Sequence, residues 1–234
     1  MTPRERARAR TEQEIRAIAW RHLEEQGAAA LSLRAIAREV GIVSSAIYRY
    51  VPSREELLTD LIIEGYTDLA DAAGAAEAGL LAQDGEASPR LRWLAVVRAV
   101  AAWARRRPAA WTLLYGSPVP GYAAPPERTT DAGTRVMIRL AHIVADASVR
   151  GEQRTVLTAG IEVPPGLASG LREASRAVGL DGDERVVADT VLGWTLVIAL
   201  ITSELFEQFG RETFADTGAW LDFALETTAT AAGL

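Results

Sequence analysis

The sequence predicts an all-α protein in which a small three-helix domain is followed by a larger helical domain. Apolar residues recur at the three- and four-residue spacing of amphipathic helices, and no stretch shows the clear alternation of a β-strand. Capping residues precede many of these apolar stretches, and glycine or proline follows them. The chain has 234 residues, 49% of them hydrophobic, so it can bury a sizeable core.

The first helix is predicted over residues 11–26. Thr11 and Glu14 have the spacing of a capping box, in which each side chain accepts a hydrogen bond from the other residue's backbone N–H. Gly27 follows the last apolar turn and favours an end there. The preceding segment 3–10, with four arginines and one glutamate, is by itself more typical of a solvated tail than of a phosphate-binding segment.

Two short helices follow. Ser32 is a candidate N-cap for the second helix, and Gly41 ends it because glycine adopts a left-handed conformation readily. The third helix is predicted over residues 44–51, and Pro52 ends it. These two helices and the glycine turn have the size and spacing of a helix-turn-helix. Its buried face would consist of Ile36, Ala37, Val40, Ile42, Ile47 and Val51.

The remainder of the chain is also predicted to be helical. Ser53 and Glu56 form a second capping box at the start of a long amphipathic helix, and the segment Gly74–Gly85 is expected to break it. Segment 117–126 has four prolines and one glycine, which predicts a surface loop. Further helices are predicted from Ser88 to the Arg105–Arg107 run and over residues 108–115, 127–149, 166–178, 183–209 and 216–231.

Charge is unevenly divided along the chain. Residues 1–54 hold ten arginines and six glutamates, a net charge of +4, whereas the remainder holds 15 basic and 25 acidic residues, a net charge of −10. A basic end on an acidic body confines phosphate affinity to that end. The overall charge of −6 is therefore compatible with binding to nucleic acid.

The outward side chains of the third helix have the chemistry for reading DNA. A helix of this size fits a major groove ~12 Å wide, where Arg49 could bind a guanine through two hydrogen bonds. Tyr48 and Tyr50 could contact phosphate or thymine methyl groups, and Ser32 with neighbouring backbone N–H groups could hold phosphate. Any helical hairpin with a polar outer face would give the same local pattern. The outward set is Ser44, Ser45, Tyr48 and Arg49.

Residues 32–58, SLRAIAREVGIVSSAIYRYVPSREELL, closely resemble the DNA-binding signature of TetR/AcrR-family regulators. LRAIAREVG, AIYRY and SREELL occur in the family's order and spacing, and the similarity extends over residues 11 to about 60. The resemblance implies a helix-turn-helix DNA-binding domain at residues 1–55 and a helical effector-binding and dimerisation domain at 56–234. It also implies a transcriptional regulator, expected to be a repressor that a small apolar or aromatic effector releases from a palindromic operator.

The resemblance implies DNA contacts at eight positions. Arg54 replaces the family's usual phosphate-contacting lysine, and Tyr50 stands where the family has a phosphate-contacting histidine or tyrosine. Val43 departs from the pattern, because the family often places a helix-capping serine there. The implied contacts are Ser32, Arg34, Ser44, Ser45, Tyr48, Arg49, Tyr50 and Arg54.

An effector site is predicted among the central helices, where the family builds its pocket. Aromatic rings with a few polar groups suit an apolar or aromatic ligand. For each ring, ordinary core packing is the more frequent role, and His142, between Ala141 and Ile143, has the sequence context of a core histidine. The candidates are Trp93, Trp103, Trp111, Tyr115 and His142, with Tyr122 in the proline-rich loop.

The last two helices are expected to pair with a second copy in an intersubunit four-helix bundle, with an intrachain core as the alternative. The apolar run 191–202 is too short to span a membrane and is expected to be a covered helix. Bundle positions would be Val191, Ile198, Leu205, Trp220, Leu221 and Leu225.

Other functions are less favoured by the residues present. The chain has no cysteine, two histidines, no glycine-rich phosphate loop and no histidine–glutamate metal cluster, so we expect no enzyme activity, cofactor or metal. No secretion leader or membrane span is evident, which predicts a cytoplasmic protein. The alternative function is a DNA-binding adaptor or architectural protein without an effector, which would keep the same N-terminal domain.

Overall fold

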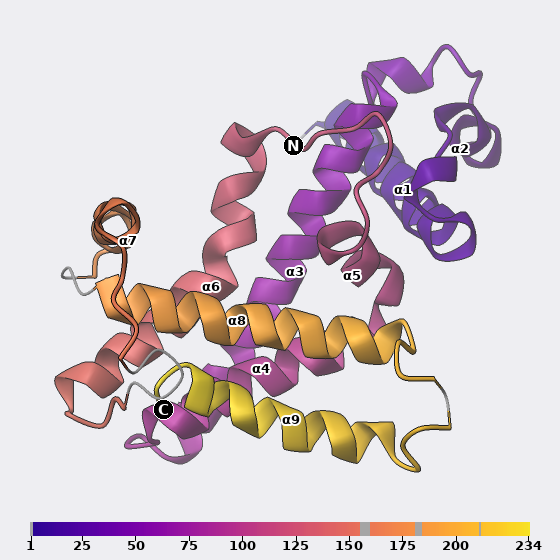
Figure 1. Ribbon diagram of the computed structural model, residues 1–234. Coiled ribbons are helices and arrows are strands. Elements are labelled where there is room, and N and C mark those ends of the chain that lie inside the picture. The colour runs from indigo at the N-terminus through magenta and orange to yellow at the C-terminus, as the bar shows by residue number, and fades with distance from the viewer. Residues whose placement is uncertain (1, 155–159, 181–183, 211) are drawn as a thin grey trace. The chain divides into compact units, whose positions relative to one another are not determined.

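The computed structural model of the chain describes residues 2–154, 160–180, 184–210 and 212–234. Within these ranges it contains nine α-helices, two short 3-10 helices and no strand, which confirms the all-α prediction (Figure 1). The chain divides into two compact units. The first comprises Met1–Asp68 and Arg107–Gly133, and the second comprises Leu69–Arg106 and Thr134–Leu234. The domain boundary near residue 55 stays a prediction.

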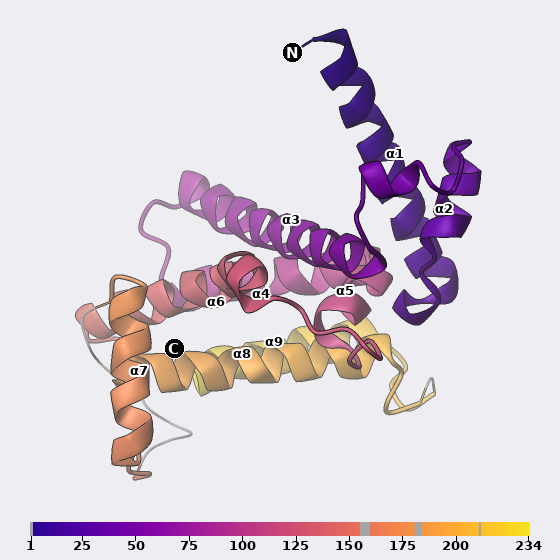
Figure 2. The same ribbon diagram turned by 90° about the horizontal axis from the view of Figure 1, so that it is seen from above.

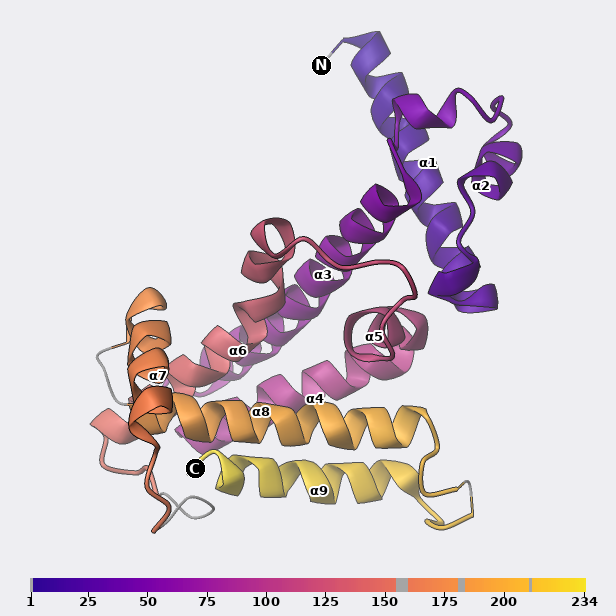
Figure 3. The same ribbon diagram turned by 45° about the horizontal axis from the view of Figure 1, so that its top comes forward.

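The first unit is built around α1, which packs against α2 and α5 (Figures 2 and 3). Its core contains Ile15, Ile36, Ile47 and Leu58, all fully buried. The helices of this unit are α1 (Pro3–Gln26), α2 (Leu33–Val40) and α5 (Pro108–Tyr115), with the first part of α3 (Arg54–Gln83) and the first turns of α6 (Pro126–Val149).

The start of α1 lies eight residues before the predicted one. The Thr2 backbone N–H donates to Glu5 Oε2 at 2.8 Å and the Glu5 N–H donates to Thr2 Oγ1 at 3.2 Å, so the capping box forms here. Thr11, the predicted cap, instead donates its hydroxyl to the carbonyl of Ala7. Proline is favourable in a first turn, and arginine and glutamate are good helix formers, so the segment read as a tail is helical.

The predicted third helix is shorter and tighter than expected. Residues 44–46 form a turn, and Ile47–Arg49 form a 3-10 helix. The Ala46 N–H donates to the Val43 carbonyl at 2.8 Å, and the Tyr50 N–H donates to the Ile47 carbonyl at 2.9 Å. Valine cannot cap a helix with its side chain, so the segment begins without the side-chain hydrogen bond that an N-cap serine would supply.

The second unit packs α4 against the antiparallel pair of α8 and α9 (Figure 1). Helix α7 contacts the first turns of α8. Trp93, Val100, Leu140 and Ile143 are fully buried in this unit. Its helices are α4 (Pro89–Arg106), α7 (Pro165–Ala177), α8 (Glu184–Leu205) and α9 (Thr217–Ala231), with the remainder of α3 and α6.

The predicted break over Gly74–Gly85 is wrong, because α3 continues through Gly74 to Gln83. Alanine, leucine, glutamate and glutamine make up most of this stretch, and their high helix propensity offsets the cost of the isolated glycines. Glu77, in the middle of the stretch, is buried and is held by arginines from two other helices. Tertiary contacts therefore fix a segment that local composition marked as a loop.

The other predicted boundaries agree with the structure to within a few residues. Ser32 caps α2 and Gly41 follows it with a φ of +79°, while Asp216 caps α9. The predicted first residue of α8, Asp183, lies outside the described residues.

Helix α8 is only partly covered. Trp194, Val197 and Ile201 face the chain's own core, whereas Leu192 and Leu196 are 40% and 38% exposed. Its most apolar 18-residue window has a mean hydropathy of 1.8, enough by length and composition to cross a membrane, and 39% of that window is buried. Core helices of soluble proteins pass the same test, so this is weak evidence for a membrane span.

The residues predicted for an intersubunit bundle divide between two environments. Leu221 and Leu225 on α9 are fully buried within the chain, so the intrachain alternative holds for them. On α8, Val191 is 38% exposed, and Ile198 and Leu205 are half-buried, so these three are not fully covered by the chain itself.

Candidate nucleic-acid interface and charged cavity

The start of α2 presents polar groups to solvent. Ser32 Oγ accepts a hydrogen bond from the Ala35 N–H at 3.4 Å, so the serine side chain caps the helix. Arg34, two residues further, is exposed. The positive end of a helix dipole, unpaired backbone N–H groups and an arginine together form a local environment that suits phosphate.

The segment after Gly41 brings four of the predicted contact residues together on the surface. Ser44, Ser45, Tyr48 and Arg49 are all exposed, with 49% of Tyr48 accessible. Tyr50 is half-buried. Ala46 and Ile47, which lie between the exposed residues, are buried and anchor the segment to the core.

Arg8 is a residue near this surface that the sequence analysis missed. Its Nη2 donates to the carbonyl oxygen of Arg49 at 3.3 Å, and its guanidinium carbon lies 5.9 Å from the centre of the Tyr50 ring. Arg8 also pairs with Glu12 one turn later at 2.7 Å. The Thr2–Glu5 capping box was the sequence signal that could have placed Arg8 on a helix.

Arg54 is engaged within the protein. Its Nη2 donates to the carbonyls of Ala28 and Ala29 at 2.8 and 3.3 Å, and its Nε donates to the carbonyl of Leu31 at 3.1 Å. These carbonyls belong to the connection between α1 and α2. Of the five N–H groups of a guanidinium, the two on Nη1 remain, and Nη1 lies 3.9 Å from Glu55 Oε1.

A buried histidine joins α1 to α2. His22 is 4% exposed, and its Nε2 lies 2.7 Å from Glu39 Oε1. Arg21 pairs with the other oxygen of the same carboxylate. The hydrogen bond with His22, together with the positive charges of His22 and Arg21, lowers the pKa of Glu39 against the opposing effect of burial.

The predicted effector residues do not form one site. Trp93 and Trp103 are buried in the second unit, where Trp93 Nε1 donates to Thr228 Oγ1 at 3.0 Å. Trp111 and Tyr115 belong to the first unit, and their ring centres lie 4.5 Å apart.

Three further aromatic candidates, Tyr115, Tyr122 and His142, have different environments. Burial and the neighbouring Tyr66 raise the pKa of Tyr115. Tyr122, in the proline-rich loop, places its hydroxyl 2.9 Å from Thr59 Oγ1. His142 is exposed, so its assignment as a core histidine is wrong; the neighbours Ala141 and Ile143 are the buried ones.

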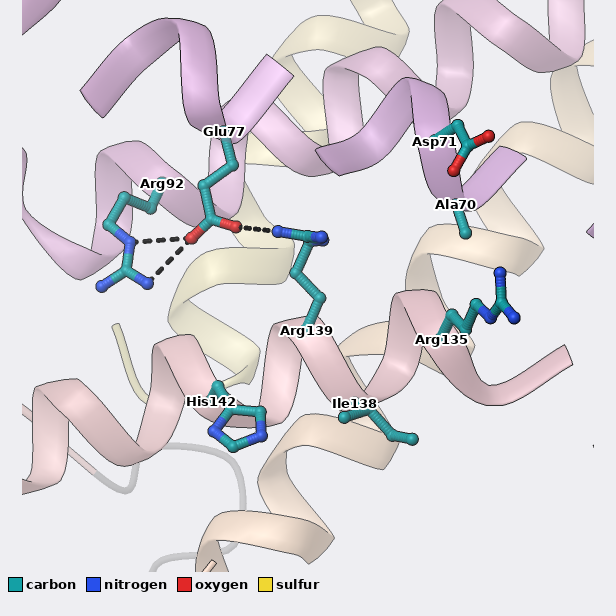
Figure 4. A pocket seen from close by; sticks show the side chains of 8 residues that line it. All are labelled: Ala70, Asp71, Glu77, Arg92, Arg135, Ile138, Arg139 and His142. Atoms are coloured by element: carbon teal, nitrogen blue, oxygen red, sulfur yellow. Dashed lines mark hydrogen bonds and ion pairs between the residues drawn. The ribbon is translucent and has the colours of Figure 1, made fainter. Parts of the chain in front are cut away.

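Helices α3, α4 and α6 line an open cavity of about 550 Å³ in the second unit (Figure 4). Ala70 and Ile138 contribute apolar surface, and the remaining lining is charged or polar. Only His142 among the predicted effector residues lines it. The polar lining residues are Asp71 and Glu77 from α3, Arg92 from α4, and Arg135, Arg139 and His142 from α6.

Glu77 is the central carboxylate of this cavity. Its Oε1 accepts from Arg92 Nε at 2.9 Å, and its Oε2 accepts from Arg139 Nη1 at 2.5 Å (Figure 4). Arg92 also donates to Asp146 Oδ2 at 2.5 Å. Burial opposes the charge of Arg92, but the hydrogen bonds with Asp146 and Glu77 outweigh it and raise the pKa of Arg92.

The cavity could not be found from sequence spacing. Its lining residues lie on three helices between positions 70 and 142, and the break predicted at Gly74 removed Glu77 from any helix. A glutamate in an alanine-rich, otherwise apolar stretch was the only local signal.

Two family models match the chain. Residues 15–61 match the model of bacterial regulatory proteins of the tetR family, and residues 93–228 match the tetracyclin repressor-like C-terminal domain. The first match includes all the predicted DNA contacts. The second covers more than half of the chain and includes most of α4 and all of α6 and α8.

Similar proteins and structures agree with these matches. HTH-type transcriptional regulators of Mycobacterium tuberculosis and Mycobacterium bovis are 42% identical over 216 residues, which is 92% of this chain and 89% of each relative. The crystal structure of a regulatory protein, SCO4313, has a TM-score of 0.73 and 29% identity, covering 97% of this chain and 98% of that one.

A tetR-family regulatory protein from Rhodococcus RHA1 shares the fold, with a TM-score of 0.62 and 16% identity over 95% of this chain and 97% of that one. The helix-turn-helix geometry, the two family models and the 42% identical relatives all indicate the same family. The chain belongs to the TetR family of bacterial transcriptional regulators, which bind DNA through a helix-turn-helix.

Proposed function

We propose that the protein is a homodimeric, cytoplasmic repressor that binds a palindromic operator and leaves it when a small effector binds the second unit. Two recognition segments in a dimer would enter successive major grooves ~34–36 Å apart. The proposed base contacts are Ser44, Ser45, Tyr48 and Arg49, and the proposed phosphate contacts are Ser32, Arg34 and Tyr50. Arg54 can reach phosphate only through Nη1, because its other donors hold backbone carbonyls.

The exposure of the recognition segment is the observation that carries this proposal. Its buried residues, Ala46 and Ile47, fix it to the core, while the polar and aromatic side chains around them face solvent. A polar surface with an arginine, beside a helix N-terminus, matches the division of DNA contacts into base reading and phosphate positioning.

An exposed apolar stripe on the second unit supports the dimer. Leu192, Leu196 and Ala199 recur at helical spacing along α8, on the side opposite its buried residues, and all three are exposed. On α9, Phe223 is 66% exposed. Burying such a stripe against its copy would remove apolar surface from water, as expected for a two-fold symmetric helical interface.

Contacts within the first unit support a route for the effector's influence. Arg107, immediately before α5, donates to Asp68 Oδ2 on α3 at 2.6 Å. Its guanidinium carbon also lies 4.8 Å from the centre of the Trp20 ring on α1. Helices α3 and α6 each continue from the first unit into the second, where they line the cavity. A ligand that shifts α3 would therefore act on the packing of α1 through Asp68 and Arg107.

The coupling needed for release is modest. A ligand that binds the DNA-free conformation with 1–3 kcal/mol of preference weakens DNA binding by roughly 5–150-fold. The cavity favours this reading over the alternative of an adaptor or architectural protein without an effector, because that alternative requires no accessible cavity.

The test begins with a genomic-fragment selection by the purified full-length protein, followed by fluorescence anisotropy on the selected sequence. We expect an inverted repeat bound by one dimer, with a dimer mass also measured in the absence of DNA. Arg49→Ala should weaken binding, whereas Arg150→Ala, on an exposed arginine of the second unit, should leave it unchanged. A monomer bound to a single half-site would contradict the dimeric part of the proposal.

A further inference from the structure

We propose that the cavity between α3, α4 and α6 binds a small molecule carrying an anionic group, a carboxylate or a phosphate ester, and that Arg139 holds that group. This inference deepens the proposed effector function and rests on it. It replaces the purely apolar or aromatic ligand that the tryptophans suggested, because those tryptophans lie in the core and not in the cavity.

Glu77 fixes the orientation of the two arginines nearest to it. A carboxylate that is only 5% exposed must be compensated by hydrogen-bonded cations, and Arg92 and Arg139 provide them. Arg92 is itself shared between Glu77 and Asp146, and its side chain is 13% exposed. The charge of Arg92 is therefore already balanced by protein carboxylates.

Arg139 is in a different position. Across the described ranges of the chain, its hydrogen-bond and ion-pair partner is Glu77 alone, through Nη1, and its side chain is 38% exposed. A guanidinium has five N–H donors, so four are left in a planar fork that matches a carboxylate or a phosphate. The fork is preorganised because Glu77 anchors one of its nitrogens.

Gly74 makes room for this guanidinium. A Cβ atom at Gly74 would lie 2.8 Å from Arg139 Nη2 and 3.3 Å from its Cζ, so any side chain there would displace the group. Glycine at this position therefore lets the end of the Arg139 side chain lie close to α3.

Most of the α6 residues that line the cavity are potential hydrogen-bond donors. Arg135, Arg139 and His142 follow one another at helical spacing and all line it, together with the apolar Ile138 (Figure 4). Asp71 is the opposing carboxylate, on α3, and it should weaken the binding of an anion. A ligand with an anionic end and an apolar body fits this division of the lining.

The experiment measures probe binding to the full-length protein by isothermal titration calorimetry. The probes are 2-naphthoate, 2-naphthyl phosphate and the uncharged 2-naphthamide, which share one apolar body. We expect at least one anion to bind about tenfold or more tightly than the amide, as charge-assisted hydrogen bonds imply. Equal affinities for all three probes, or no binding of either anion up to about 1 mM, overturns the inference.

Two variants with opposite expected effects on anion binding distinguish an electrostatic effect from damage to the fold. Arg139→Gln should remove the preference for the anion, and Asp71→Asn should strengthen anion binding about two- to threefold, since it removes a like charge. Arg98→Gln, which removes an α4 arginine paired with Glu226 outside the cavity, serves as the matched control. Anion binding that is unaffected by both cavity variants overturns the assignment to Arg139.

Operator binding is measured separately with and without each probe. If an anion binds through Arg139 and the operator affinity does not change, the anion site stands and the proposed effector function fails. If the amide releases the operator as well as the anions do, the effector function stands and the preference for an anion fails.

Discussion

Arginines are paired differently in the helix-turn-helix region and around the cavity. In the helix-turn-helix region, Arg8 and Arg54 hold backbone carbonyls, and Arg34 and Arg49 are exposed. Arg8 also pairs with Glu12, and Arg21 pairs with Glu39. Residues 1–54 hold ten arginines and six glutamates, so an excess of positive charge remains available to an external polyanion. Around the cavity, the arginines are held by carboxylates, so positive charge is largely neutralised within the protein.

The two regions suit different kinds of ligand. The first 54 residues keep a net charge of +4, spread over a surface that could contact many phosphates. The cavity has a local balance of charges, in which one partly satisfied arginine can select a single anionic group.

Trp93→Ala tests whether the second unit contains a packed core where an aromatic pocket was expected. The ring is fully buried, and its Cη2 would lie 2.8 Å from a Cβ at Gly193, so the packing around it is close. We expect a loss of about 3–5 kcal/mol in the free energy of unfolding, measured by denaturant titration. Trp93→Phe should lose less. A loss below about 1 kcal/mol would mean that the ring is not a core element.

Arg54→Gln tests whether this arginine stabilises the fold or contacts DNA phosphate. Removing the hydrogen bonds to Ala28, Ala29 and Leu31 should cost about 1–3 kcal/mol of stability and weaken operator binding without changing its dependence on salt.

The contrasting variant is Arg34→Gln. Replacing this exposed arginine should lower the slope of log K against log salt by about 0.9 for each phosphate that the side chain neutralises, or by roughly twice that in a dimer, with little effect on stability. The measurement is anisotropy across a salt series. If Arg54→Gln changes the slope as much as Arg34→Gln does, Arg54 binds phosphate.

Arg49→Ala tests the exposed side of the comparison. If Arg49 reads a base, the variant should lose about 1–3 kcal/mol of specific affinity and discriminate less at one operator position. Its stability should be unchanged, because the side chain is exposed. Anisotropy with single-base operator variants measures both effects, and unchanged affinity for the operator removes the proposed role.

Glu39→Gln tests the contact between α1 and α2 and has the smallest expected effect. The pKa of Glu39 is lowered in the folded protein by His22 and Arg21, so its ionised form stabilises the fold. This contribution is complete above the ordinary pKa of 4.5 and is lost as the pH falls through the lowered value. The wild type should therefore be more stable than the variant at neutral pH, and the difference should shrink in acid. Denaturant midpoints of the wild type and the variant, measured at neutral and at acidic pH, give this difference in stability. A difference that grows in acid would contradict the stabilising role of the ionised Glu39 carboxylate.

The sequence predicted the elements whose signals are local. Ser32 and Gly41 bound a two-turn helix through a side-chain cap and a left-handed glycine, and both signals lie within the residues they shape. The exposure of Ser44, Ser45, Tyr48 and Arg49 is confirmed, whereas their contacts with DNA stay a prediction.

The elements that sequence reasoning missed depend on partners distant in the chain. Glu77 is buried because Arg92 and Arg139 reach it from other helices, which made a glycine-containing stretch helical where a break was expected. Trp93 and Trp111 are both fully buried, yet each occupies the core of a different unit. The periodicity of apolar residues assigns such residues to the apolar face of a helix, but it does not predict which other helix that face packs against.

The contact from Arg8 to the Arg49 carbonyl has a practical consequence for how the protein is produced. An affinity tag fused ahead of α1 would add chain next to Thr2, whose backbone N–H and side chain form the first cap of that helix. Unwinding the first turns would loosen the helix that carries Arg8, and with it the loop that Arg8 holds. Binding constants from a tagged preparation should therefore be compared with those obtained after the tag has been cleaved.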